Sequence, residues 1–143
     1  MHTIQQILDE KGRDVFAIAP GASVYDAIDM MADKGVGALM VMDGDTMVGV
    51  ISERDYARKV ILQGRSSKET KVEEIMTAEV ITTDGHETVD QCLGVMTTHH
   101  IRHLPIVDEG KVIGMLSIGD LVKAKIEDQA AQIESLESYI AGN

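Results

Sequence analysis

The sequence is poor in aromatic residues and in positive charge, and both shortages exclude classes of partner. Its 143 residues include no Trp, one Phe and three Tyr, so stacking of nucleic-acid bases on exposed aromatic side chains is not expected. Lys and Arg number 13 against 24 Asp and Glu, which gives a formal net charge of −11. That balance disfavours binding to a nucleic-acid backbone or to an anionic membrane surface. An anionic ligand would need basic side chains gathered in one place.

Cysteine and long apolar runs are also scarce. Cys92 is the single cysteine, so no intrachain disulfide is expected and a reducing compartment is favoured. Its place among apolar helix positions favours a small buried residue over a reactive thiol. No cationic start followed by an apolar run is present, and no stretch of 18 apolar residues occurs. We therefore expect a cytoplasmic protein, and the 44% of hydrophobic residues predicts one domain with a substantial core.

An internal repeat is the most informative feature of the chain. Residues 15–61 recur at residues 80–126, shifted by 65 positions without a gap. The identical pairs are Val15/Val80, Val24/Val89, Met31/Met96, Leu39/Leu104, Asp43/Asp108, Gly49/Gly114, Ser52/Ser117, Asp55/Asp120 and Ile61/Ile126. Two copies of one unit predict a body with approximate two-fold symmetry. The seam between the copies would be a natural place for a ligand.

Each copy shows the same order of predicted elements. A short strand (15–19 and 80–83) precedes a helix that opens at Ser23 or Thr88 with the pattern of a capping box. Two apolar strands follow, joined by hairpin turns at residues 43–44 and 109–110. A final helix begins near Ser52 or Ser117. The pattern predicts an α+β fold of two β-α-β-β-α repeats, with an N-terminal helix at residues 3–11 and a longer C-terminal helix.

The expected organisation is one compact module. Its parts are an N-terminal helical segment (1–14), repeat 1 (15–62), a linker (63–79), repeat 2 (80–126) and a C-terminal helix extension (127–143). The tail helix carries apolar residues at heptad-like positions, interrupted by Gln129. These are Val122, Ile126, Ile133, Leu136 and Ile140. Such a stripe is long enough to pack against a partner helix.

Two motifs carry a resemblance to a known family. The segments GVISERD (49–55) and GMLSIGD (114–120) resemble the G-h-h-[ST]-x-x-D signature of the paired cystathionine β-synthase (CBS) domain. IRHLPIVD (101–108) is similar to the family's central strand, and IMT (75–77) to the segment that often precedes a repeat. The resemblance implies two repeats packed through their sheets, with two clefts that bind adenine nucleotides. AMP and NAD(H) are the ligands expected first; ATP, ADP and S-adenosylmethionine are the other possibilities.

The resemblance also implies roles for individual residues. Asp55 and Asp120 would accept hydrogen bonds from ribose hydroxyls, supported by Ser52 and Ser117. A carboxylate can take both hydrogens of a vicinal diol through strong charge-assisted bonds, and a neighbouring helix N-terminus suits an anion. Expected phosphate ligands are Arg54, Arg58, Arg102 and His103, and expected contacts to adenine or through the backbone are Val36, Gly37, Ile101 and Thr83. The same Ser-x-x-Asp segments also have the form of capping boxes that simply close helix N-termini. The two interpretations are compatible.

The two copies differ in their basic residues. Arg54 in the first copy aligns with Gly119, whereas Arg102 and His103 in the second align with Gly37 and Ala38. We therefore expect two unequal clefts. 

A cluster of histidines raises the question of a metal. His99 and His103 are spaced i,i+4, which would suit zinc on a helix. His103, however, is predicted at a change from helix to strand, and no Cys or carboxylate completes a ligand set nearby. Phosphate contact or a solvated turn is therefore favoured, and no metal is expected.

The function expected from these features is regulatory. No nucleotide-binding or catalytic motif of an enzyme is present, so neither catalysis nor a catalytic cofactor is expected. The leading hypothesis is a sensor that binds an adenine nucleotide, forms a homodimer and signals to an unidentified partner protein. The alternative is a structural or interaction module with degenerate clefts and no ligand. The presence of both Asp55 and Asp120 argues against degeneration.

Overall fold

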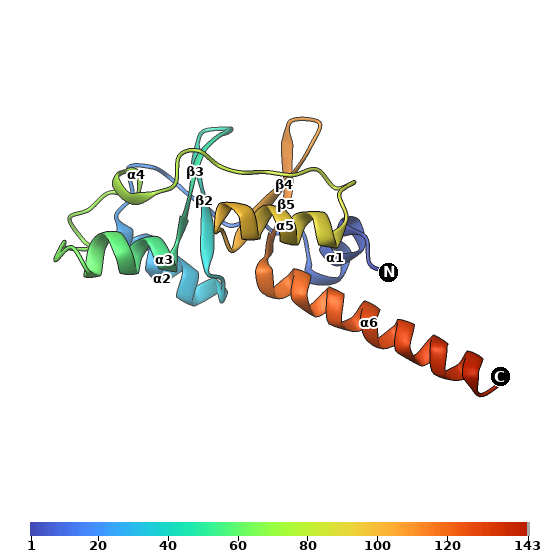
Figure 1. Ribbon diagram of the computed structural model, residues 1–143. Helices are drawn as coiled ribbons and strands as arrows, with labels where there is room; N and C mark the ends of the chain where they lie inside the picture. Colours follow the sequence, from blue (N-terminus) through green and yellow to red (C-terminus); the bar gives the residue numbers. More distant parts are fainter. Residues whose placement is uncertain (143) are drawn as a thin grey trace. The chain divides into compact units, whose positions relative to one another are not determined.

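The computed structural model describes residues 1–142 and shows an α+β fold (Figure 1). The chain divides into two compact units. One consists of Val15–Val80, which we call the first-repeat unit. The other combines residues 1–14 with the chain from residue 81 onward, and we call it the second-repeat unit. None of the described helices is long and apolar enough to cross a membrane.

The first-repeat unit is built on a three-stranded sheet of order β1-β2-β3. The strand β1 pairs in parallel with β2, and β2 pairs antiparallel with β3. The elements are β1 (Ala17–Ile18), α2 (Val24–Lys34), β2 (Ala38–Asp43), β3 (Thr46–Ser52), α3 (Glu53–Tyr56), the π-helix η1 (Ala57–Ile61) and α4 (Val72–Ile75). A core that includes Leu39, Val41 and Ile51 lies between this sheet and its helices.

The second-repeat unit is built on an antiparallel hairpin, β4–β5. Its elements are α1 (Ile4–Lys11), α5 (Val89–His99), β4 (His103–Asp108), β5 (Lys111–Ser117) and α6 (Ile118–Ile140). The register repeats that of the first hairpin. His103 faces Ser117 as Ala38 faces Ser52, which confirms the two-fold repetition at the level of strand pairing.

Proline shortens the first strand of the second copy. We expected strands at 15–19 and 80–83; the first is reduced to two residues, and the second to a single parallel bridge between Thr83 and Ile106. In the first copy the Met40 N–H donates to the Phe16 carbonyl at 3.0 Å. Pro105 occupies the equivalent position of the second copy and has no N–H to donate. The equivalent hydrogen bond cannot form there.

The helix predicted to begin near Ser52 is present, and one predicted capping box needs correction. The helix that begins after Ser52 stays α-helical for one turn and continues as the π-helix η1. At the start of α2, Ser23 accepts a hydrogen bond from the Asp26 N–H without a reciprocal bond, whereas Thr88 and Gln91 form the full capping box at α5. The N-terminal helix begins after its cap Thr3 and ends at Gly12, as predicted.

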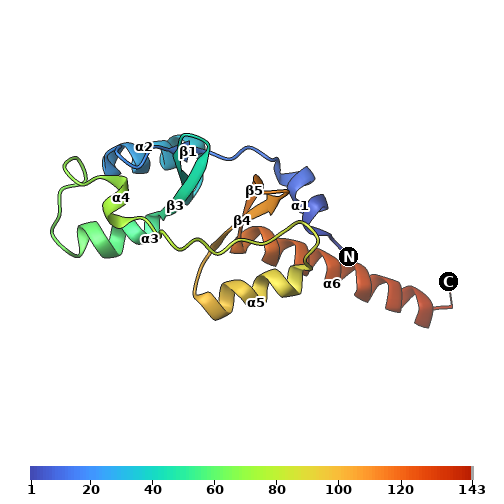
Figure 2. The ribbon, with the colours of Figure 1, turned by 90° about the horizontal axis from the view of Figure 1, so that it is seen from above.

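The segment before each repeat packs on the other repeat. The helix α1 precedes the first repeat, yet its Ile4, Ile7 and Leu8 are buried in the core of the second-repeat unit. Figure 2 shows α1 beside the β4–β5 hairpin, and α1 contacts both β5 and α6. Conversely, α4 precedes the second repeat, and its Val72 and Ile75 are buried in the first-repeat unit.

A glycine in each hairpin allows this close approach. A Cβ on Gly49 would lie 2.6 Å from Met76 Sδ and 2.9 Å from the Thr77 carbonyl oxygen. A Cβ on Gly114 would lie 2.5 Å from Leu8 Cδ2. Both glycines open the repeated motif, so part of that motif serves packing rather than ligand binding.

We predict that Gly49→Ala destabilises the protein by about 1–3 kcal/mol, because the new methyl group collides with backbone as well as with Met76. Gly94→Ala is the matched control, since nothing lies within 4 Å of its Cβ position in α5. That change should stabilise by about 0.5–1 kcal/mol. Urea unfolding of both variants measures the difference. Equal stability of Gly49→Ala and the parent would contradict the close approach.

Candidate functional site

Each Ser-x-x-Asp motif lies where the second hairpin strand passes into a helix. At the end of β3 the Ser52 N–H donates to Asp55 Oδ2 at 3.0 Å, and the Asp55 N–H donates to Ser52 Oγ at 3.1 Å. At the end of β5 the corresponding distances between Ser117 and Asp120 are 2.8 and 3.2 Å. Both motifs are therefore complete capping boxes. The structural interpretation of the motif is confirmed, and it leaves the ligand interpretation open.

Each motif aspartate also forms an ion pair with a lysine. Lys59 Nζ lies 3.1 Å from Asp55 Oδ1 and donates to the Ile75 carbonyl. Lys11 Nζ lies 2.5 Å from Asp120 Oδ2 and donates to the Met115 carbonyl. The two lysines come from non-equivalent places in the sequence. Both carboxylates are nevertheless placed in a local positive environment.

The Asp120 carboxyl is held in its charged form. Burial alone would raise its pKa, but hydrogen bonds from Lys11 and from the Ser117 backbone, with the charge of Lys11, outweigh that effect. The net result is a pKa below the ordinary value. Asp120 therefore remains an acceptor-only group at neutral pH, which is the form that hydroxyl donors require.

The segment before the central strand joins each motif through its backbone. The Glu53 N–H donates to the Gly37 carbonyl at 3.1 Å, and the Ile118 N–H donates to the Arg102 carbonyl at 2.8 Å. The structure thus brings Gly37 and Arg102 to the helix N-termini at which Asp55 and Asp120 lie. Their neighbours Val36 and Ile101 are half-buried.

The remaining predicted residues are distributed over both units. In the first-repeat unit Arg54 is half-buried in α3 and Arg58 is exposed in η1. In the second, Arg102 is exposed and His103 is half-buried at the start of β4. Thr83 lies beside Ile106, three residues along β4 from the partner of Ser117. Within its own unit Thr83 is therefore displaced from the motif by about 10 Å of strand.

A hollow of about 220 Å³ lies next to Asp120 in the second-repeat unit. It is lined by Ile7, Glu10, Lys11, Asp120, Lys123, Ala124 and Glu127. Sequence reasoning missed Lys11 and Lys123 as cations near the motif. Lys123 follows Asp120 by three residues on α6, so helical spacing could have identified it.

Cys92 takes no part in this site. Its side chain is fully buried in the second-repeat core, and burial raises the pKa of the thiol to about 11. A thiol in that state is a poor nucleophile. The predicted role of Cys92 as a small buried residue is confirmed.

Comparison with known proteins places these features in a family. The model of the CBS domain matches residues 8–61 and again residues 72–127. The chain is 39% identical to the CBS domain-containing protein CBSX3, mitochondrial, of Arabidopsis thaliana, over 98% of this chain and 72% of that protein.

Solved structures give the same result. A CBS-domain protein from Burkholderia ambifaria MC40-6 is 53% identical, with a TM-score of 0.85 over 90% of this chain and 96% of that one. The CBS domain pair of protein MJ0100, solved with 5′-methylthioadenosine and S-adenosyl-L-methionine, is 25% identical, with a TM-score of 0.78 over 90% and 98% of the two chains. Two matches of one domain model, a duplicated motif and this structural similarity show that the chain belongs to the CBS domain family and carries a tandem pair of its domains.

Proposed function

We propose that the protein is a regulatory sensor that binds an adenine nucleotide and transmits its occupancy to a partner protein. The observation that carries the proposal is the pair of ordered carboxylates, Asp55 and Asp120, at equivalent helix N-termini. Each would hold the ribose of a nucleotide, with Ser52 and Ser117 fixing the carboxylate. The domain pair of MJ0100 supports this ligand class, because it was solved with two adenosine-containing compounds.

The basic residues favour a ligand that carries phosphate. Arg54, Arg102 and His103 lie on the motifs or on the segments joined to them. S-adenosylmethionine has no phosphate for these side chains to bind, whereas AMP and NAD(H) do. We therefore place AMP and NAD(H) first, followed by ATP and ADP. Because Arg54 belongs to one copy and Arg102 to the other, we propose two sites of unequal affinity.

Capping and ligand binding can use different atoms of one carboxylate. In Asp120 the backbone N–H of Ser117 and the Lys11 ammonium both contact Oδ2. We assign Oδ1 to the ribose. The capping contact would then orient the carboxylate before the ligand arrives, which lowers the entropy lost on binding.

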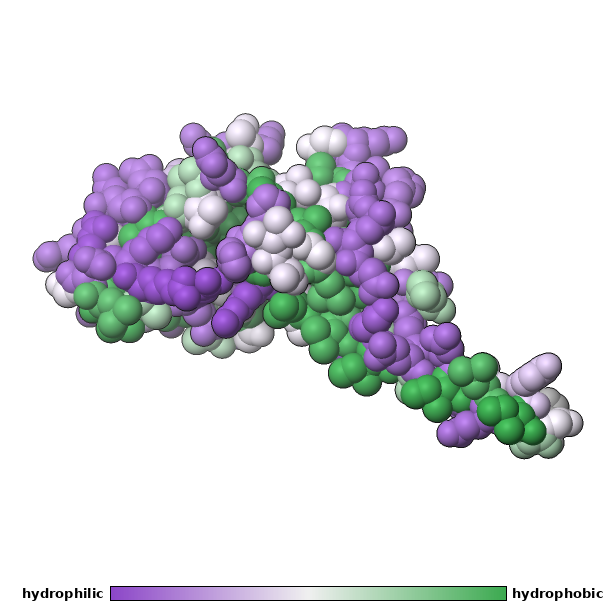
Figure 3. All heavy atoms as spheres, in the orientation of Figure 1, coloured by the Kyte–Doolittle hydropathy of each residue, from purple (hydrophilic) through white to green (hydrophobic). Residues whose placement is uncertain are grey.

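A second copy of the chain is the proposed partner of α6. Figure 1 shows α6 extending beyond the rest of its unit, and Figure 3 shows apolar atoms along its length. Exposed apolar residues on it are Val122, Ile126, Ile133, Leu136, Tyr139 and Ile140. An apolar stripe of this length is typical of an interaction surface. Pairing of two such helices would form a homodimer.

The alternative function is an interaction module without a ligand. The completeness of both capping boxes favours it, since capping alone can account for the presence of both Asp residues. The nucleotide proposal explains in addition the basic residues around the motifs. We propose no catalytic activity and no catalytic cofactor. A cytoplasmic location and the identity of the regulated partner stay predictions.

We predict that AMP or NAD(H) raises the melting temperature of the protein. At ten times its dissociation constant a ligand stabilises the folded state by about 1.4 kcal/mol. A thermal-shift screen with AMP, ADP, ATP, NAD, NADH, S-adenosylmethionine and adenosine, followed by calorimetry, tests this. Absence of both a shift and binding heat for every compound at millimolar concentration would refute the sensor proposal.

Substitution of the motif aspartates separates the two interpretations. We expect Asp120→Ala to weaken AMP binding at its site roughly 10- to 150-fold, because a charge-assisted hydrogen bond contributes about 1.5–3 kcal/mol. Asp55→Ala should act on the other site. Thr88→Ala is the control, since it removes the N-cap contact of α5 outside the motifs. It should lower stability by about 0.5–2 kcal/mol and leave affinity unchanged.

The phosphate assignment has a separate readout. Arg54→Ala should weaken AMP far more than adenosine, because only AMP offers a phosphate to the guanidinium. Equal losses for the two ligands would remove Arg54 from the phosphate site. Unchanged affinity in both Asp variants, in folded protein, would leave only the capping role.

The dimer prediction is tested on α6. Ile133→Asp and Leu136→Asp should convert the dimer to a monomer, because each places a charge in the proposed apolar seam. Gln132→Asp on the same exposed helix is the control and should leave the dimer intact. Light scattering after size exclusion gives the mass of each variant. A monomeric mass for the parent chain up to about a hundred micromolar would contradict the proposal.

A further inference from the structure

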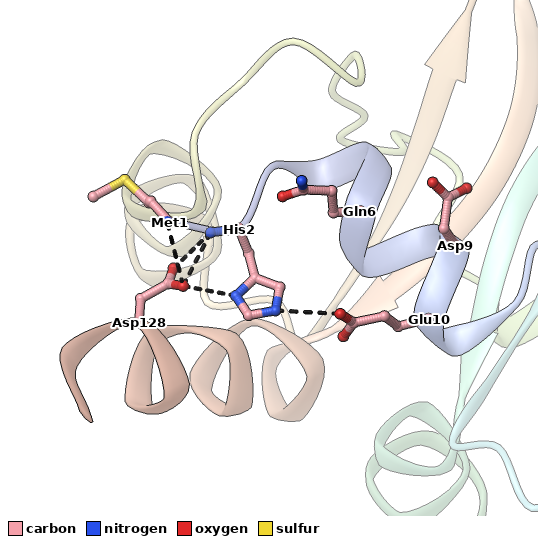
Figure 4. A pocket seen from close by; sticks show the side chains of 6 residues that line it. All are labelled: Met1, His2, Gln6, Asp9, Glu10 and Asp128. Atoms are coloured by element: carbon pink, nitrogen blue, oxygen red, sulfur yellow. Dashed lines mark hydrogen bonds and ion pairs between the residues drawn. The ribbon is translucent and has the colours of Figure 1, made fainter. Parts of the chain in front are cut away.

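A histidine and three carboxylates meet where the chain before α1 crosses α6. His2 lies just before α1, Glu10 lies on α1, and Glu127 and Asp128 lie on α6. Figure 4 shows the His2 ring between Asp128 and Glu10, at the edge of a hollow of about 430 Å³. These residues belong to the second-repeat unit and lie outside both Ser-x-x-Asp motifs.

The two ring nitrogens of His2 have different partners. Nδ1 lies 2.7 Å from Asp128 Oδ1, and the Asp128 carboxylate also accepts the His2 backbone N–H at 2.9–3.0 Å. A hydrogen bond from Nδ1 to Asp128 would leave Nε2 with its lone pair. Metal-binding histidines almost always have such a carboxylate or carbonyl partner behind the ring, because it fixes the tautomer and the orientation.

His2 Nε2 faces two further carboxylates. Nε2 lies 3.4 Å from Glu10 Oε1 and 3.5 Å from Glu127 Oε2. In a tetrahedral zinc site with bonds of about 2.0–2.1 Å, the ligand atoms are separated by about 3.3–3.4 Å. All three ligand atoms of His2, Glu10 and Glu127 lie within 4.8 Å of one another. The two distances from His2 Nε2 therefore match the spacing of such a tetrahedron, and the two carboxylates lie close enough to complete the set.

We propose that His2, Glu10 and Glu127 bind a divalent transition metal of the zinc class, with Asp128 orienting the histidine. One imidazole and two carboxylates match the ligands that Zn²⁺ uses in proteins, whereas the imidazole disfavours Mg²⁺ and Ca²⁺. Water would complete the coordination. The metal would link α1 to α6, so binding would strengthen the packing of the N-terminal helix on the second repeat.

The competing explanation needs no metal. The hydrogen bond to Asp128 raises the pKa of His2. Partial burial opposes this effect, and the negative charges of Asp128, Glu10 and Glu127 add to it. A protonated His2 could then form ion pairs with the same carboxylates. In that case the cluster is an internal salt-bridge network, and Zn²⁺ at micromolar concentration would leave the protein unchanged.

The test is a titration of the untagged, EDTA-treated 143-residue chain with Zn²⁺, monitored by calorimetry and by thermal unfolding. We expect one Zn²⁺ per chain and a higher melting temperature. His2→Gln and Glu10→Gln should each weaken Zn²⁺ binding about 100-fold or more, and Asp128→Asn about 10- to 100-fold. Glu10 is 64% exposed, so Glu10→Gln should fold. Bound Co²⁺ should give the visible bands of a four-coordinate site.

The controls are His86→Gln and Glu134→Gln, both at exposed positions of the same unit. They should bind Zn²⁺ like the parent. Binding that persists in His2→Gln and disappears in His99→Gln would place the metal at the end of α5 and overturn the proposal. An equal response to Mg²⁺ would indicate screening of the acidic surface and would overturn it as well. The proposal would also be overturned if Zn²⁺ gave neither binding heat nor a higher melting temperature.

Discussion

The hydrogen bond from a serine backbone N–H to the aspartate three residues later holds the junction between hairpin and helix in both repeats. It fixes the direction in which α3 leaves β3 and α6 leaves β5. The next backbone N–H then reaches the carbonyl that precedes the central strand, at Gly37 or Arg102. These two hydrogen bonds together join three elements of each repeat, and the first of them positions the carboxylate on which the proposed function depends.

The lysines that contact the two motif aspartates come from different places in the sequence. Lys59 reaches Asp55 from one helical turn away, whereas Lys11 reaches Asp120 across 109 positions of sequence. The two sites share the capping geometry and differ in the source of their positive charge. This difference adds to the unequal distribution of arginines, and it gives the second site a direct connection to the N-terminal helix.

Local sequence patterns predicted most of the helices and strands. They did not predict contacts between residues far apart in the sequence. The hairpins followed from alternation and turn residues, because both act over a few positions. The loss of the strand at 80–83 depends on Pro105, whose effect appears only when its pairing partner is known. The Lys11–Asp120 pair and the cluster around His2 join residues more than a hundred positions apart. The apolar periodicity of the N-terminal helix does not indicate on which repeat the helix packs. The motif residues were identified from the sequence, while the geometry of a complete cleft stays a prediction.

The segment before each repeat packs on the other repeat, and this arrangement sets the order in which the two units can fold during synthesis. The first-repeat unit can close once residue 80 has left the ribosome, because its helix α4 is already present. The helix α1 emerges earlier but must wait for β5 and the start of α6, more than a hundred residues later. At about 5–20 residues per second this delay is on the order of ten seconds. Throughout that interval Ile4, Ile7 and Leu8 lack their native partners, so the nascent chain exposes three apolar side chains to chaperones or to neighbouring chains.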